Sequence, residues 1–261
     1  MKSATLGLLL YTLLGSQLLL AQGSPQDYRI VFDPTPMDRF PSQWRTPEIA
    51  ISATALPEHE YDRTKVVLED ALSKYPGTIL ANNLRETVVV QELGFSGVSA
   101  SGTNSNDQVF LANGGARRGF TDKWLERVFH SELSSILLRN HASDFRNDRW
   151  HAVNPDSFSY GEGGIAAVKK GEIGKFFDPK LLKRGFLSQY AQSSLENDFN
   201  AFAGFLWLGE EKLWDASEKH PTIGIKLKLT IDFYQSIDSS IDADFFVGLA
   251  TSERFRDLEE Q

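Results

Sequence analysis

The sequence predicts a single α+β domain in which a small antiparallel sheet packs on helices. Hydrophobic residues make up 41% of the chain and charged residues 24%, which is typical of a globular protein. Runs rich in β-branched residues begin at positions 28, 86 and 108, whereas the last third carries apolar residues at three- and four-residue spacing. Both strand and helix patterns are therefore present, and we assign residues 24–250 to one domain.

The first 23 residues have the pattern of a secretory signal peptide. Lys2 gives a basic start, a leucine-rich run follows over 6–20, and Ala21 and Gly23 are small residues where cleavage can occur. Polar and small residues at 15–17 interrupt the apolar run, which argues against a retained membrane anchor. We therefore expect a secreted or periplasmic protein with no membrane span after signal cleavage.

The net charge indicates which partners the protein is not expected to bind, and the cysteine content indicates how the fold is stabilised. The formal net charge is −8, which makes nucleic acid and anionic lipid poor partners. The chain has no cysteine, so no disulfide framework holds it and its stability must come from its core.

Strands are expected at 28–32, 86–93 and 108–112, the last two as a hairpin-like pair joined by the polar loop 96–107. An amphipathic helix is expected over 58–74, because apolar residues recur there at helical spacing until Pro76 and Gly77 end the pattern.

The helices expected after residue 120 form most of the remaining domain. A helix over 122–140 begins after Thr121, a good N-cap. Residues 142–185 read as mostly irregular, with part of 164–170 expected to pair as a strand. Further helices are expected over 195–214, capped by Ser193 or Ser194, and over 221–237, before a charged tail at 251–261.

The 122–140 helix contains a frame that resembles a zinc-protease motif. In H-E-x-x-H the two histidines lie on one helix face and bind one zinc ion, while the glutamate activates a water molecule. Here the histidine positions hold Ser131 and Ser135, and the glutamate is Glu132. A neutral hydroxyl is not a normal zinc ligand. His130 is turned by about 100° from Ser131 around the helix, so no residue pair on this helix forms a metal site by itself.

Structural roles are also open for these residues. His130 can be a buried histidine that hydrogen-bonds to a carbonyl or carboxylate group. Glu132 lies among apolar neighbours, where an unpaired charge is costly, and Arg127 or Arg139 could neutralise it.

Three stretches, at 120–137, 185–199 and 220–238, together resemble the zincin-like, zinc-binding metallopeptidases that bacteria export. The first is similar to the family's H-H-E-F-x-H-x-L helix and the second to its G-F-V-S-x-Y-A and E-D-F-A-E segment. The resemblance implies a zincin-like fold over 24–250. It places the family's zinc-binding histidines at Ser131 and Ser135, its third ligand at Ala201, and its catalytic glutamate at Glu132.

The resemblance leaves Glu132 and Asp198 in place and removes the nominal ligands. We expect these two carboxylates to face a common cleft together with His130 or Glu196. The first hypothesis is therefore a catalytically disabled relative, without zinc, that binds a peptide, a glycan or a partner protein in this cleft.

Two alternatives stay open. An active zinc metallohydrolase would use a relocated site with Glu132 as the catalytic residue. His130, Asp198, Glu196 or His151 would then be its metal ligands. A structural protein of the cell envelope would keep the cleft as a remnant only.

Overall fold

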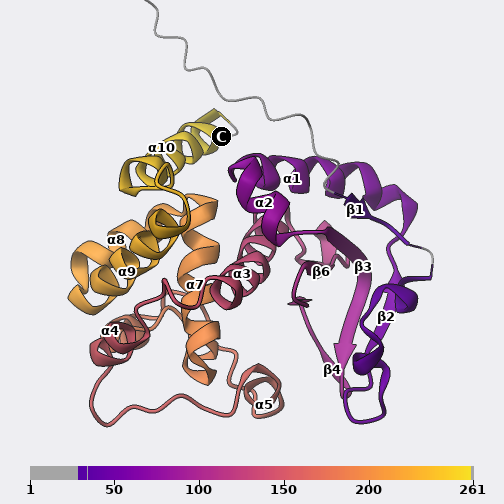
Figure 1. Ribbon diagram of the computed structural model, residues 1–261, viewed down its shortest axis with the longest axis horizontal. Coiled ribbons are helices and arrows are strands. Elements are labelled where there is room, and N and C mark those ends of the chain that lie inside the picture. The colour runs from indigo at the N-terminus through magenta and orange to yellow at the C-terminus, as the bar shows by residue number, and fades with distance from the viewer. Residues whose placement is uncertain (1–28, 34, 260–261) are drawn as a thin grey trace, which may run out of the picture.

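The computed structural model describes residues 29–33 and 35–259, and it forms a sheet and a helical part side by side (Figure 1). Helices α3 (Asp122–Asn140) and α7 (Leu195–Leu208) pack along each other in the middle, between the sheet and the C-terminal helices. The expected signal peptide at 1–23 lies outside the described residues. The chain is thus a mixed α+β protein, as the sequence predicts.

The sheet has six strands in the path β1–β3–β6–β5, with β2 and β4 also paired to β3. These are β1 (Arg29–Val31), β2 (Ser52–Ala55), β3 (Glu86–Phe95), β4 (Val98–Ser99), β5 (Gly102–Asn104) and β6 (Gln108–Ala112). Strands β1 and β6 run parallel to β3, whereas β2 and β4 are antiparallel to β3, and β5 to β6. The sheet is mixed, and the prediction of an antiparallel sheet is wrong.

The path of the chain between β3 and β6 explains the error. A tight turn at Ser96 and Gly97, both with positive φ, sends the chain back along β3 as β4 and then onward as β5. A second turn at 105–107 leads into β6, which therefore runs in the direction of β3. The predicted loop 96–107 contains these two short strands, so β3 and β6 are not a hairpin.

Alternating residues of the sheet pack into two cores. Val89, Val109 and Leu111 face the helices, while Val88, Val90 and Phe110 face the other side. The N-terminal segment covers that second side with the 3₁₀ helices η1 (Pro36–Arg39) and η2 (Ser42–Arg45), and Phe40 stacks on Phe110 at 4.5 Å between ring centroids. The larger core lies between the sheet, α3 and the helices beyond it.

Most of the expected helices are confirmed. The structure has α1 (Tyr61–Ser73), α2 (Gly77–Asn83), α3, α7, α8 (Glu211–Lys219), α9 (Pro221–Ile237) and α10 (Ala243–Glu259), with 3₁₀ helices η3 (Glu58–Glu60) and η4 (Ala116–Arg118). The helix predicted over 195–214 is interrupted, because Gly209 adopts a left-handed conformation, φ 73°, that ends α7 before α8 begins. Residues 251–259 of the predicted tail continue α10.

The stretch 142–185 contains more regular structure than its sequence indicates. Three short helices form there, α4 (Asn147–Val153), α5 (Gly164–Lys169) and α6 (Pro179–Leu182), followed by the 3₁₀ helix η5 (Tyr190–Ser193). The prediction of a strand within 164–170 is wrong. Residues 164–169 form a short helix that packs on η5 and also contacts β4, but in the described part of the chain they pair with no strand of the sheet.

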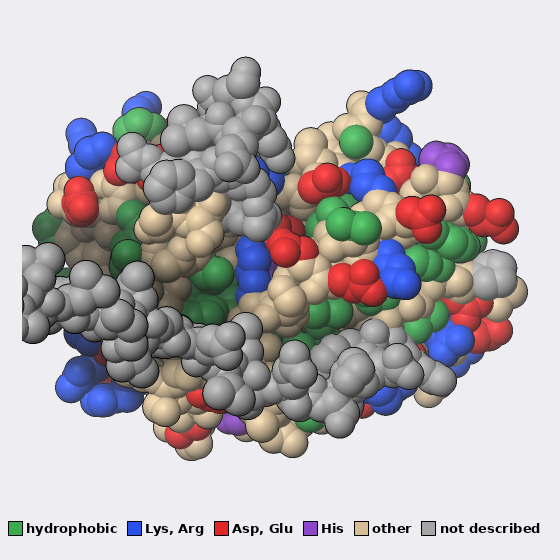
Figure 2. Space-filling view, turned by 90° about the horizontal axis from the view of Figure 1, so that it is seen from above, with side chains coloured by type: hydrophobic (Ala, Val, Ile, Leu, Met, Phe, Trp, Pro, Cys, Tyr) green, Lys and Arg blue, Asp and Glu red, His purple; other side chains and the backbone are tan. Residues whose placement is uncertain are grey.

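Acidic, basic and hydrophobic side chains are interspersed on the face seen in Figure 2, without a large area of one charge sign. Within 29–33 and 35–259, no helix combines the length and the apolarity needed to cross a membrane.

Candidate functional site

Helix α3 places the residues of the candidate site against both the sheet and α7. Thr121 caps its start, with Oγ1 accepting a hydrogen bond from the Trp124 backbone N–H at 3.3 Å. The helix contacts β5 and β6 on one side and α7 on another. Glu132 therefore faces the sheet edge, whereas Ser131 and Ser135 face α7.

The two serines hold α3 to α7 through a single residue. Ser131 Oγ donates to the Asn200 carbonyl oxygen at 3.1 Å, and Asn200 Nδ2 donates to Ser135 Oγ at 2.6 Å. The helices are also very close, since a Cβ atom at Gly204 would lie 2.4 Å from Ser131 Oγ and 3.0 Å from the Arg127 carbonyl oxygen. We call Ser131, Ser135, Asn200 and Gly204 the serine joint.

The donors at the serine joint do not fit a zinc ion. Zinc in proteins is bound by cysteine, histidine and carboxylate groups, whereas this joint offers two neutral hydroxyls and an amide. Ala201, at the third ligand position, has no donor atom at all. Across the described part of the chain, no group of three or more His, Cys, Asp or Glu side chains is arranged to hold a metal ion.

Glu132 lies in a separate polar group under the edge strand β5. Asn104 Nδ2 donates to Glu132 Oε2 at 2.6 Å. Arg139 bridges the same region, since it donates to Asn104 Oδ1, to the Ser105 carbonyl oxygen at 2.7 Å and to Glu196 Oε1 at 3.1 Å. We call Asn104, Glu132, Arg139 and Glu196 the Glu132 cluster. It joins β5, α3 and the start of α7.

Burial is the main cause of the raised pKa of Glu132. Loss of solvent around the carboxyl raises the pKa of Glu132 to about 7, with Glu196 adding to the rise and Asn104, Arg139 and Arg127 opposing it. Glu132 can therefore gain or lose a proton near neutral pH.

Burial also shifts the pKa values of two side chains that interact with Glu132. Burial lowers the pKa of Arg127 to about 10, and its guanidinium lies 4.8 Å from the centre of the Phe176 ring. Burial and the negative charge of Glu132 raise the pKa of Tyr190 to about 12. Both side chains are thus electrostatically linked to Glu132.

His130 belongs to a different, fully buried network. Tyr75 donates its O–H to His130 Nδ1 at 2.8 Å, and His130 Nε2 lies 3.4 Å from Glu126 Oε1. Glu126 also forms an ion pair with Lys74. These contacts are satisfied when the imidazole is neutral and carries its proton on Nε2. Although burial opposes it, the hydrogen bond from His130 and the charge of Lys74 lower the pKa of Glu126 to about 2.

We expect His130 to stay neutral down to mildly acidic pH. Burial lowers its pKa below that of free histidine, against the attraction of Glu126. Its imidazole nitrogen resonances, followed by NMR from pH 8 downward, should titrate below the ordinary midpoint of about 6.5. A midpoint at or above that value would contradict the buried, neutral arrangement.

Asp198 belongs to a third network, inside the helical part. Asp198 and Lys226 are both 0% exposed, and their side chains pair at 2.7 Å through Asp198 Oδ2. The same oxygen accepts hydrogen bonds from Tyr160 at 2.6 Å and Trp150 at 3.1 Å. Lys226 also donates to the Gly185 carbonyl oxygen at 2.9 Å. Burial raises the pKa of Asp198 and lowers that of Lys226, while their pairing opposes both shifts.

The structure therefore does not bring the predicted site residues together. Glu196 is in the Glu132 cluster, but His130 and Asp198 each have their own partners in separate buried networks. His151 is exposed, and its ring meets the ring of Tyr160, a member of the Asp198 network, edge-on at 5.6 Å. No local pattern points to Asn104 or Asn200, because their roles depend on contacts with residues 28 and 65 positions away in the chain.

No family model and no curated protein matches the sequence. The chain is similar to a solved structure from Bacteroides caccae, described as a "putative zinc-binding metallo-peptidase", at 16% identity and a TM-score of 0.47. The similarity covers 75% of this chain and 78% of that one. A likeness of this size does not assign a function.

Proposed function

We propose that this chain is an exported, metallopeptidase-like protein that does not hydrolyse peptides with zinc and that binds an extended peptide along the edge strand β5. The observation that carries the proposal is the division of roles on α3. The two histidine positions of the motif hold serines that bind α7, while the glutamate remains beside an edge strand. Its location outside the cytoplasm rests on the signal-peptide pattern of residues 1–23.

The serine joint supports the loss of zinc chemistry. Its hydroxyls already hydrogen-bond to Asn200, and the space next to Ser131 is taken by Gly204. A zinc ion would need deprotonated or imidazole donors and room for a water molecule, and the joint provides neither.

Strand β5 supports peptide binding. It is at the end of the sheet path and, among the described strands, pairs only with β6, so its other edge offers backbone groups with which an extended chain could pair. Helix α5 contacts β4, the strand that precedes β5, and together with η5 it lines a pocket of about 330 Å³ that includes Gln189, Gln192 and Ser193. The exposed Ile165, Ile173 and Phe176 lie on the same segment and offer apolar contacts.

The first test measures zinc and hydrolysis together. After equilibration with zinc and removal of the loosely bound fraction, we expect far less than one zinc per chain and no cleavage of a random hexapeptide library by mass spectrometry. One retained zinc per chain, with hydrolysis abolished by Glu132→Gln but not by Glu92→Gln, would overturn the proposal. Glu92 is a suitable control because it is exposed on β3.

The second test measures how the peptide binds. The best-binding hexapeptide is methylated on its backbone nitrogens at alternate positions, in two complementary patterns. Because only every second residue of an added strand pairs with the edge, one pattern should abolish binding and the other should leave it. Equal binding by both methylated peptides would refute pairing with β5.

A further inference from the structure

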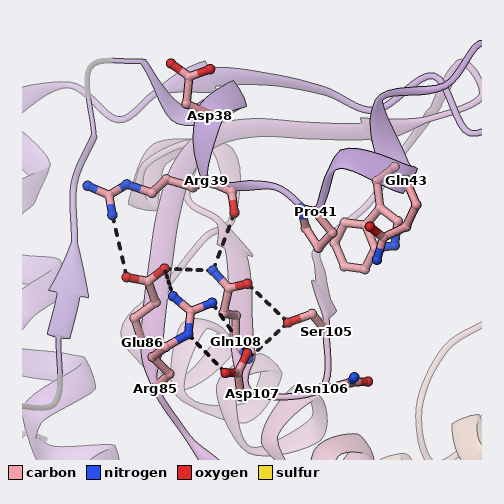
Figure 3. A pocket seen from close by; sticks show the side chains of 11 residues that line it. Asp38, Arg39, Pro41, Gln43, Arg85, Glu86, Ser105, Asn106, Asp107 and Gln108 are labelled. Carbon is pink, nitrogen blue, oxygen red and sulfur yellow. Dashed lines mark hydrogen bonds and ion pairs between the residues drawn. The ribbon is translucent and has the colours of Figure 1, made fainter.

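A second pocket, of about 550 Å³, lies at the ends of β3 and β6 where Glu86 pairs with Gln108 (Figure 3). The 3₁₀ helices η1 and η2 and the loop 105–107 complete it. Its size is within the range of about 300–1,000 Å³ that is usual for ligand pockets. None of its lining residues belongs to the Glu132 cluster or the serine joint.

The floor of this pocket is charged but internally balanced. Glu86, 3% exposed, accepts hydrogen bonds from Gln108 at 2.7 Å and Arg85 at 3.0 Å, and Arg39 lies 3.7 Å from its other oxygen. Arg85 also donates to Asp107 at 3.0 Å, and Arg39 to Asp33 at 2.6 Å. Because each of these charges has an opposite partner, the pocket favours neither a strong anion nor a cation.

The walls combine planar polar groups with an aromatic surface. Gln43 and Asn106 are exposed and make no hydrogen bond within the part of the chain that the structure describes. Figure 3 shows Pro41 and Gln43 on one side of the pocket and Arg85 and Glu86 on the other. Trp44, partly exposed, meets the Phe95 and Phe110 rings edge-on at 5.9 and 5.6 Å, and none of its ring contacts among the described residues is stacked.

We propose that this pocket binds a neutral oligosaccharide. A sugar ring has an apolar C–H face, which stacks on an indole, and a rim of hydroxyls, which both donate and accept hydrogen bonds. Trp44 and Pro41 supply the apolar surface, whereas Gln43, Asn106 and Asp107 supply amide and carboxylate groups for the hydroxyls. The balanced floor selects a ligand without net charge.

A printed array of neutral and acidic oligosaccharides, probed with the purified protein, identifies the ligand, and calorimetry then measures its affinity. We expect neutral members to bind. Trp44→Ala should weaken the best of them at least tenfold, Trp44→Phe should lose less, and Asn106→Ala should weaken it several-fold. Trp124→Ala, which changes a partly exposed tryptophan on α3, is the matched control and should have no effect.

Because Trp44 also packs on the second core, folding of each variant is checked by circular dichroism. If Trp44→Ala does not fold, the binding affinities of Gln43→Ala and Asn106→Ala test the proposal instead. Both residues are exposed, so these variants should fold. No binding by any neutral member, binding of acidic members only, or affinities unchanged in the folded pocket variants would overturn the proposal.

Discussion

Lys226→Met is expected to lower the free energy of unfolding by about 3–5 kcal/mol, the usual cost of leaving a buried charge without its partner. Lys226 and Asp198 are both 0% exposed, and Lys226 is the cation that neutralises Asp198. Tyr160 and Trp150 can still donate to Asp198, but neither carries a charge. Urea denaturation followed by circular dichroism measures the difference.

The same helix provides the control. Lys228 and Asp232 also pair at 2.7 Å, but their side chains are 74% and 39% exposed, so Lys228→Met should change stability by less than about 1 kcal/mol. Adding Asp198→Asn to Lys226→Met should restore much of the lost stability, because the buried charge is then removed. Additive effects of the two changes would contradict a direct pairing.

Glu132→Gln is expected to stabilise the protein at pH 8 by about 1–3 kcal/mol and to change its stability little at pH 4. The folded state raises the pKa of Glu132 from 4.5 to about 7, chiefly by burial. The unfolded chain therefore loses this proton first, and the native protein is progressively destabilised as the pH rises from about 4.5 to about 7. Glutamine has no proton to lose and can still accept the hydrogen bond from Asn104.

The expected 1–3 kcal/mol is smaller than the free energy that corresponds to the whole pKa shift of Glu132. The reason is that the side chain is partly exposed, so water screens its charge. Thermal unfolding of both proteins between pH 4 and 8 measures the effect. Glu92→Gln, at an exposed position of β3, should show no comparable pH dependence. A Glu132→Gln variant that is less stable than the native protein at pH 8 would mean that the ionised carboxylate is favourable where it lies.

The sequence predicted the parts of the site that depend on local pattern. Helix α3 and its cap at Thr121 follow from spacing. Glu196, which was expected beside Glu132 as an addition to Asp198, does lie near it through Arg139, whereas Asp198 lies in a separate network. The residue opposite the two serines could not be predicted this way. The resemblance put the third ligand at Ala201, whereas the residue that contacts both serines is Asn200, because the rotation of α7 about its axis depends on packing between the two helices.

The relative direction of the strands could not be predicted from local sequence pattern either. The run 86–93 and the run 108–112 were correct as strands, but their relative direction depends on β4 and β5, which are only two and three residues long. Such short, polar strands are defined by their partners and not by their own residues. For the same reason Asn104 was expected to lie in a loop, although it is the residue that binds Glu132.

The close approach of α3 and α7 at Gly204 limits which substitutions this protein can tolerate. A histidine at position 131 would need room that the α7 backbone now occupies, since even a Cβ atom at Gly204 would come within 2.4 Å of the present hydroxyl. A single substitution therefore cannot install a metal ligand there without moving α7. Positions 131, 135, 200 and 204 should accordingly vary together among relatives, and a return to histidine should appear only where both helices have changed.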